Sequence, residues 1–155
     1  MLSAISIKQH ELAMREAIKV AAANPAYPFG AVITNGRTGQ LMASGVNASR
    51  SNPTFHGEMV CINNYVQQHG NKSWGDLVLY TTGEPCSMCM SALTWSGIGG
   101  EVYGSSIASI THAGIRQINV SAQSVIDAAD FHKPDLLGGV LEAECNTLFM
   151  QRDRA

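Results

Sequence analysis

One histidine, two cysteines and one glutamate occur at spacings that suit a catalytic metal. His56 and Glu58 are two residues apart. Cys86 and Cys89 lie at i and i+3, directly after Pro85. An imidazole and two thiolates suit Zn²⁺, and three protein ligands leave a position for water, whereas structural zinc sites are closed by four. The pattern predicts one zinc ion per chain with these three ligands, and with Glu58 as the general acid and base that moves protons at that water.

Other interpretations of the same residues stay open. A cysteine pair at i and i+3 is also typical of redox proteins or of two packed thiols, and zinc can serve as a non-catalytic scaffold. Retention of Glu58 argues against both, although a glutamate in the first turn of a helix also gains from the helix dipole. Cys61 follows His56 by five residues and so points to another face of a helix, about 140° around. Cys61 and Cys145 are therefore expected to be core residues.

Periodic apolar residues predict the elements that position these side chains. Helices are expected over Ile7–Ala23, Thr54–His69, Pro85–Ser96, Ser121–Ala129 and Val140–Gln151, and strands over Phe29–Thr34, Leu41–Val46, Leu77–Thr82, Glu101–Gly104 and Arg116–Val120. In the second helix, Thr54 is the expected N-cap and Met59, Ile62 and Val66 the buried stripe. Gly97 is the expected C-cap of the third. Strands that alternate with helices predict an α/β layer sandwich, with both halves of the motif at helix starts.

Length and composition limit the possible classes of protein. A chain of 155 residues is expected to form a single domain over residues 1–155. Charged residues make up only 14%, which suggests that another subunit covers part of the surface. The net charge is −2 and the ten Lys and Arg residues form no basic run, so no nucleic-acid partner is expected, although a dimer could pool them. No apolar run approaches about 18 residues and no signal peptide is evident, so a cytoplasmic protein without a membrane span is expected.

The remaining polar and aromatic candidates each have two interpretations. Asn47 follows a predicted strand and could serve as a turn residue or as an amide that binds a heterocycle. Glu84 could cap a helix, and Trp95 could be either a pocket wall or plain core. His112 lies in a loop that could border a pocket. Three further histidines are expected on the solvated surface: His10, His69 and His132.

Three segments resemble the cytidine deaminase-like superfamily. Pro28–Ile33 is similar to the first strand of guanine deaminases and of the bacterial tRNA adenosine deaminase, and Asn52–Glu58 to their zinc helix. Tyr80–Cys89 completes the order H-x-E then P-C-x-x-C, the signature of zinc deaminases that act on nucleobases. Gly57 matches fungal cytosine deaminase, whereas most relatives carry alanine there. The chain most closely resembles the bacterial nucleoside deaminase branch.

This resemblance implies a fold, a reaction and a set of contacts. The fold would be a three-layer α/β/α sandwich with a central, mostly five-stranded mixed sheet, assembled as a homodimer. The reaction would be zinc-dependent hydrolytic deamination of a small aminated heterocycle, a guanine- or cytosine-like base or nucleoside, with release of ammonia. Deamination of adenosine within tRNA is the alternative. Substrate contacts are expected from Phe29, Asn47, Gly57, Glu84, Pro85 and Trp95.

The resemblance has gaps where relatives choose their substrates. Guanine deaminases carry an acidic residue after the fourth strand, whereas Ser105–Gly114 contains none. The tail Phe149–Ala155 matches neither the aromatic and acidic tail of fungal cytosine deaminase nor the basic helix of the tRNA enzyme. The sequence therefore predicts the class of reaction and leaves the heterocycle open.

Overall fold

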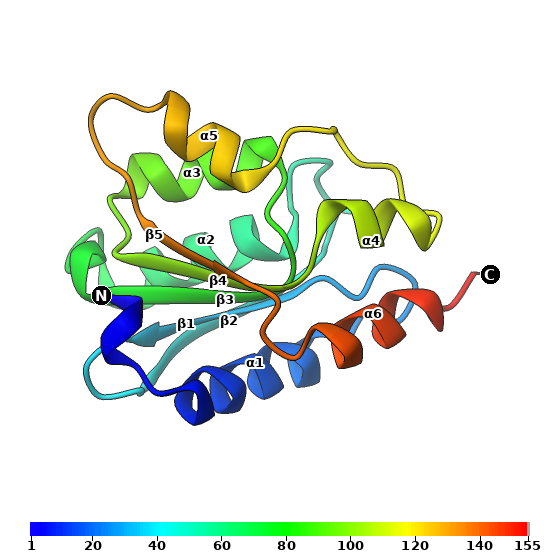
Figure 1. Ribbon diagram of the computed structural model, residues 1–155, viewed down its shortest axis with the longest axis horizontal. Coiled ribbons are helices and arrows are strands. Elements are labelled where there is room, and N and C mark those ends of the chain that lie inside the picture. The colour runs from blue at the N-terminus through cyan, green and yellow to red at the C-terminus, as the bar shows by residue number, and fades with distance from the viewer. Residues whose placement is uncertain (155) are drawn as a thin grey trace.

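The computed structural model describes residues 1–154 and contains a five-stranded mixed sheet (Figure 1). The strands are β1 (Gly30–Asn35), β2 (Leu41–Val46), β3 (Leu77–Gly83), β4 (Gly100–Ser105) and β5 (Asp135–Gly138), in the order β2-β1-β3-β4-β5. Strand β1 is antiparallel to both of its neighbours, whereas β3, β4 and β5 are parallel to one another. The carboxyl ends of the three parallel strands therefore meet at one edge of the sheet.

Helices cover both faces of this sheet. They are α1 (Ile7–Ala21), α2 (Gly57–His69), α3 (Ser87–Ser96), α4 (Ile107–His112), α5 (Ala122–Ala128) and α6 (Glu142–Met150), with short 3₁₀ turns at Leu2–Ala4 and Trp74–Asp76. Helices α1 and α6 lie below the sheet in Figure 1, and α2, α3 and α5 lie above it. The predicted three-layer α/β/α sandwich with a five-stranded mixed sheet is confirmed.

Two apolar cores fill the spaces between the layers. All seven residues of β3 are buried, as expected for a central strand that is covered on both faces. Alternate side chains of the strands enter opposite cores. The lower core, between the sheet and helices α1 and α6, includes Met14, Ala17, Val32, Val78, Tyr80, Val102 and Cys145. The upper core, under α2, α3 and α5, includes Ile33, Cys61, Tyr65, Leu79, Met90, Leu93 and Ile126.

The start of α2 differs from the prediction. The N-cap residue is His56, and its side chain makes no capping hydrogen bond. Thr54 was expected in this role, but its backbone N–H and its hydroxyl both donate to Asn52 Oδ1, in a turn that precedes the helix. The histidine side chain is thereby left free for another partner. In contrast, Gly97 is confirmed as the C-cap of α3, in the left-handed conformation with φ of 78°.

The buried face of α2 is also displaced from the predicted one. Glu58, Cys61 and Tyr65 are buried at i, i+3 and i+7, whereas Met59 and Ile62 are half-buried and Val66 is exposed. The predicted stripe was wrong by one position because Glu58, a charged residue, occupies a position that faces the sheet. This rotation directs the carboxylate toward β3.

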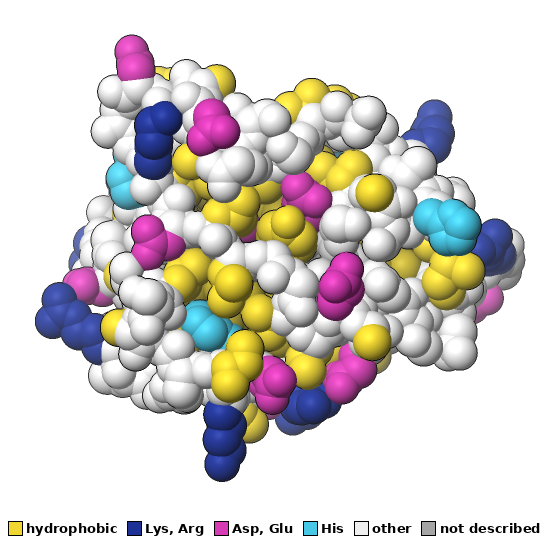
Figure 2. All heavy atoms as spheres, viewed as in Figure 1, with side chains coloured by type: hydrophobic (Ala, Val, Ile, Leu, Met, Phe, Trp, Pro, Cys, Tyr) yellow, Lys and Arg dark blue, Asp and Glu magenta, His cyan; other side chains and the backbone are white. Residues whose placement is uncertain are grey.

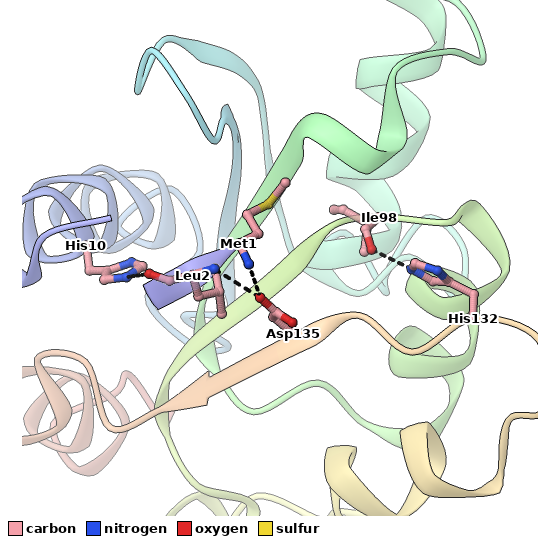
Figure 3. Close-up of polar contacts among 6 residues, drawn as sticks. All are labelled: Met1, Leu2, His10, Ile98, His132 and Asp135. Carbon is pink, nitrogen blue, oxygen red and sulfur yellow. Dashed lines mark hydrogen bonds and ion pairs between the residues drawn. The ribbon is translucent and has the colours of Figure 1, made fainter. Parts of the chain in front are cut away.

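The fifth strand is not the segment that alternation predicted. Residues 116–120 form no strand, and Ile118 and Val120 are exposed. The place beside β4 is taken by β5, whose first residue Asp135 accepts hydrogen bonds from the Met1 ammonium at 2.6 Å and from the Leu2 N–H at 3.0 Å (Figure 3). The strand is short and half-exposed, so its sequence signal is weak.

The three histidines expected at the surface are all partly or fully buried. His10 is 3% exposed and lies between the Tyr80 hydroxyl, at 2.9 Å, and the Leu2 carbonyl, at 3.2 Å. His132 Nε2 contacts the Ile98 carbonyl at 2.7 Å, and Figure 3 shows both sites. His69 Nε2 contacts the Met42 carbonyl at 2.9 Å. Each ring therefore ties a helix or loop to its neighbour.

The face of the molecule that is visible in Figure 2 carries few charged side chains around its middle. On the face in Figure 2, Lys and Arg side chains are scattered singly, and apolar side chains are visible around its middle. Within residues 1–154, no helix has the length and apolar character needed to cross a membrane.

Candidate active site

A cavity of about 430 Å³ opens near the starts of α2 and α3. Four of its lining residues were predicted from the motif and its surroundings to do chemistry or to hold the substrate: Phe29, Asn47, Glu58 and Glu84. Two predicted metal ligands, His56 and Cys86, line it as well, while Cys89 is fully buried behind them. The cavity is therefore the place where the predicted site assembles.

The three predicted ligands converge at the start of the two helices. The ligand atoms of His56, Cys86 and Cys89 all lie within 4.8 Å of one another. His56 Nδ1 is 3.5 Å from Cys86 Sγ and 3.7 Å from Cys89 Sγ. Tetrahedral zinc, with bonds of about 2.0–2.1 Å to nitrogen and about 2.3 Å to sulfur, separates such donors by about 3.6 Å. The donor set and its spacing fit zinc, and no fourth His, Cys, Asp or Glu in residues 1–154 joins the group.

The thiols are already polarised for metal binding. Hydrogen bonds from Cys89 and from His56 lower the pKa of Cys86 to about 4, against the opposing effect of burial. The same contact with Cys86 raises the pKa of Cys89, and a hydrogen bond to Cys86 raises the pKa of His56. Cys86 therefore loses its proton more readily than Cys89 does. A divalent cation bound there would favour loss of the remaining thiol proton.

Glu58 lies beside the cluster and is 3% exposed. Its Oε2 accepts a hydrogen bond from Cys89 Sγ at 3.6 Å, and its Oε1 lies 3.4 Å from the hydroxyl oxygen of Thr81 on β3. Burial raises the pKa of Glu58 to about 7. A carboxyl group that is held next to the metal ligands and opens onto the cavity is in position to pass protons to a bound molecule.

Phe29 and Asn47 form part of the cavity wall next to these groups. The Phe29 ring packs against Phe149 of α6, with ring centroids 4.8 Å apart. Asn47 Oδ1 accepts a hydrogen bond from the Ser49 N–H at 2.9 Å, which fixes the orientation of the amide. Its Nδ2 group therefore remains a donor that is available to a ligand.

Three other predicted contact residues support the site from behind. Both Glu84 oxygens are already bonded: Oε2 accepts from the Ile107 N–H at 2.8 Å and Oε1 from the Ala122 N–H at 2.9 Å. Glu84 thus joins the starts of α4 and α5 to the cavity wall. Pro85 and Gly57 are buried and are not among the lining residues. A Cβ atom on Gly57 would collide with the Phe29 carbonyl oxygen, which accounts for glycine at this position.

The expectation that Trp95 forms a pocket wall is corrected. Its side chain is 76% exposed and stacks on Phe131 with ring centroids 4.5 Å apart. Trp95 lies near the end of α3, whereas the cavity is at the start of that helix. His112 is likewise exposed at the end of α4 and is not among the lining residues.

Several lining residues had little or no signal in the sequence. They are Tyr27, Ser49, Gly114, Ile115, Arg116, Gln117, Ile118 and Arg152. They come from loops and from the C-terminal segment, where no periodicity or motif marks a side chain as functional. A weak signal was available in Arg116 and Arg152, two cations in segments with few acidic residues.

The comparisons with known proteins agree with this geometry. The family described as the cytidine and deoxycytidylate deaminase zinc-binding region matches residues 7–105, which include every predicted ligand and Glu58. The chain belongs to this family. It is a zinc-binding deaminase, a hydrolase that acts on carbon–nitrogen bonds.

Relatives within the family differ in substrate. The chain is 29% identical over 145 residues to a tRNA-specific adenosine deaminase of Rickettsia bellii, covering 89% of this chain and 94% of the relative. It is 26% identical over 152 residues to a probable cytosine deaminase of Schizosaccharomyces pombe, covering 92% of each. The guanine deaminase of Nitrosomonas europaea shares the fold, with a TM-score of 0.79 at 20% identity over 90% of this chain and 81% of that one.

Proposed function

We propose that this protein deaminates a small aminated heterocycle, a guanine- or cytosine-like base or nucleoside, and releases ammonia. The observation that supports it most directly is the position of Glu58, a buried carboxylate that opens onto the cavity beside His56, Cys86 and Cys89. A metal scaffold or a redox pair would have no use for that carboxylate.

The roles of the residues follow from their positions. His56, Cys86 and Cys89 would hold the zinc ion, which would supply a water molecule of lowered pKa beside Glu58. Glu58 takes one proton from the attacking water and passes it to the ring nitrogen. It then moves the second proton of that water from the new hydroxyl group to the leaving amine, so that ammonia departs and a carbonyl remains. Phe29 packs against the ring plane. The Asn47 Nδ2 group donates a hydrogen bond to an acceptor on the ring.

A direct test combines metal analysis with product detection. The purified protein is expected to contain one zinc per chain and to release ammonia from at least one member of a panel of free bases and nucleosides. Glu58→Gln serves as the matched control, because it should retain zinc while losing activity. Zinc-loaded protein that releases no ammonia from any base, nucleoside or tRNA stem-loop would argue against the proposal.

The alternative substrate is adenosine within tRNA. It is supported by the tRNA-specific relative, which aligns over most of both chains. A free base or nucleoside is favoured because the net charge is −2 and the cations on the visible face are scattered. Turnover of a tRNA stem-loop, with none on free bases or nucleosides, would decide for the alternative.

We further propose a homodimer in a reducing compartment, the cytoplasm. The stacked pair Trp95 and Phe131 leaves 76% and 54% of these side chains exposed, an apolar surface that a second subunit would cover. All four cysteines are unpaired, which zinc ligation by Cys86 and Cys89 requires. Light scattering at micromolar concentration is expected to give twice the chain mass of 16.5 kDa, and Trp95→Glu should shift it toward the monomer.

A further inference from the structure

Two arginines line the cavity without an acidic partner. Arg116 and Arg152 are both lining residues. The side-chain ion pairs found in residues 1–154 involve other cations: Arg15 with Glu144, Lys19 with Glu16, and Arg37 with Asp76. The positive charges at the cavity therefore face no compensating carboxylate of their own.

Arg152 is held in a fixed position by neutral groups. Its Nη1 donates to the Ala26 carbonyl at 3.1 Å, and its guanidinium carbon lies 5.5 Å from the centroid of the Tyr27 ring. Its Nε is buried without an acceptor, and Nη2 has no hydrogen bond within the described part of the chain. Nη2 thus remains available to a ligand, and a guanidinium N–H group makes a charge-assisted hydrogen bond to an oxygen of a carboxylate or phosphate.

The other polar groups around the cavity also favour a ligand that carries hydrogen-bond acceptors. Glu58 and Glu84 are the only acids among the described lining residues. Glu58 is committed beside the metal ligands, and both oxygens of Glu84 accept backbone N–H groups. Asn47 offers its Nδ2 group because Ser49 occupies its oxygen. Away from the metal ligands, the charged groups that the cavity leaves for a ligand are therefore cations, and Asn47 adds a donor; both favour acceptors on the ligand.

We propose that Arg152 is a specificity-determining residue that binds a negatively charged oxygen group, a carboxylate or a phosphate, on the substrate. The inference rests on the proposed function, since it assumes that the deaminated heterocycle occupies this cavity. Arg116, which is exposed, adds to the positive potential at the same opening. The substrate would thus carry an amino group at the metal end and an anionic group toward Arg152.

RNA is the less favoured source of that charge. A nucleic-acid surface needs several exposed cations along a track, because affinity comes from many phosphate contacts. Arg152 is half-buried in the wall of the cavity, against Tyr27 and the Ala26 carbonyl. This placement suits one anionic group of a small molecule that enters the cavity.

Matched pairs of ligands test the proposal on the zinc-loaded protein. The pairs are cytosine with cytosine-5-carboxylate and cytidine with cytidine 5′-monophosphate, measured by calorimetric binding and by ammonia release. The anionic member of at least one pair is expected to bind about tenfold or more tightly than its neutral partner, as for a charge-assisted hydrogen bond. The pair that shows this preference identifies carboxylate or phosphate as the source.

Variants assign the preference to Arg152. Arg152→Gln should abolish the preference, so that the two members of a pair bind equally, and Arg152→Lys, which keeps the charge but not the guanidinium geometry, should retain part of it. Arg37→Gln is the matched control, since Arg37 is exposed and pairs with Asp76 outside the cavity. Zinc content of each variant reports whether the site is folded.

Three results would overturn the proposal: no binding of any anionic probe, equal binding of charged and neutral members, or a preference that survives in Arg152→Gln. Arg152-dependent binding of a tRNA stem-loop alone would also overturn it, in favour of RNA. If the wild type deaminates neutral bases but binds the charged and neutral members of every pair equally, the proposed function stands and this inference fails. If no ligand releases ammonia while the binding preference holds, the proposed reaction fails instead.

Discussion

The two ends of the cavity are built in different ways. At the metal end, every group comes from the start of one of two helices. His56 and Glu58 lie at the start of α2, and the two cysteines lie at the start of α3. At the other end, the lining residues come from separate loops and from the C-terminal segment, at Tyr27, Ser49, 114–118 and Arg152.

This difference indicates that the helix starts carry out the reaction and that the loops select the substrate. Helix starts that are anchored on a buried strand fix the positions of the ligand atoms to within a few tenths of an ångström, as metal binding requires. Loops tolerate substitution and insertion, so they can change the ligand without disturbing the metal. The relatives agree, since one family includes proteins named for adenosine in tRNA, cytosine and guanine. Mutations at the metal end should therefore abolish activity, and mutations at the other end should change which ligand is used.

The largest effect is expected at the metal ligands. Cys89→Ala removes a fully buried ligand, so the protein should lose zinc, all detectable deamination and part of its thermal stability, because metal binding is linked to folding. Metal analysis and a thermal melt measure this. Cys61→Ala is the matched control, since Cys61 is equally buried but stands apart from the ligand cluster. Full zinc content in Cys89→Ala, or zinc loss in Cys61→Ala, would contradict the assignment of ligands.

Loss of the proton carrier should be nearly as damaging to the rate and harmless to the metal. Glu58→Gln keeps the shape of the side chain and removes its ability to exchange a proton, so the rate should fall by about 10²–10⁴-fold with zinc retained. The measurement is ammonia release at saturating substrate beside metal analysis. Parental activity in this variant would show that Glu58 only supports the structure.

The metal end could be predicted from the sequence because its signals are local. Side-chain type and spacing identified His56, Cys86, Cys89 and Glu58 as a group, and the proline before the cysteines indicated a helix start. The structure brings these residues together within one small cluster. Four of the five strands and five of the six helices in the described residues could also be predicted, because periodic apolar residues mark them.

The opposite end could not be predicted because its neighbours are set by tertiary structure. The alternating residues 116–120 predicted a strand, but β5 occupies the place beside β4, and the segment becomes a cavity wall instead. No local pattern shows that Arg152, near the end of the chain, lies against Tyr27. Trp95 was assigned wrongly because the sequence places it on α3 but does not show whether its side chain lies near the cavity. It lies near the end of that helix, away from the cavity.

A smaller effect is expected from the amide that lies between the two ends. Asn47→Ala should lower kcat/KM, with a loss of transition-state stabilisation of about 1–3 kcal/mol, the cost of losing one hydrogen bond to a buried polar group. Asn47→Asp separates two roles, because it keeps an acceptor for the Ser49 N–H and removes the Nδ2 donor. If Asn47→Asp retains parental kcat/KM, the Asn47 side chain only holds the loop through the Ser49 N–H, and it does not bind the substrate.

The last prediction asks whether burial alone makes a carboxylate part of the site. Glu101 on β4 is fully buried, and neither of its oxygens has a partner within residues 1–154. Burial, and then the charges of Glu58 and Glu84, raise the pKa of Glu101 well above its usual value. It does not line the cavity, and in the sheet it lies beside Leu79 and Leu136. Unlike Glu58, it has nothing on which to act.

Glu101→Met should therefore stabilise the zinc-loaded protein by about 1–3 kcal/mol and leave deamination unchanged, because an unpaired buried polar group is costly. The gain should depend on pH. Above the unfolded pKa of about 4.3 the unfolded chain releases the proton that folded Glu101 keeps, so wild-type stability falls as pH rises from there toward the raised folded pKa. The variant lacks this contribution, so the difference between the two denaturation curves should widen across that interval, while the titration of Glu58 cancels between them. A variant that is less stable and less active would instead place Glu101 among the working residues of the metal end.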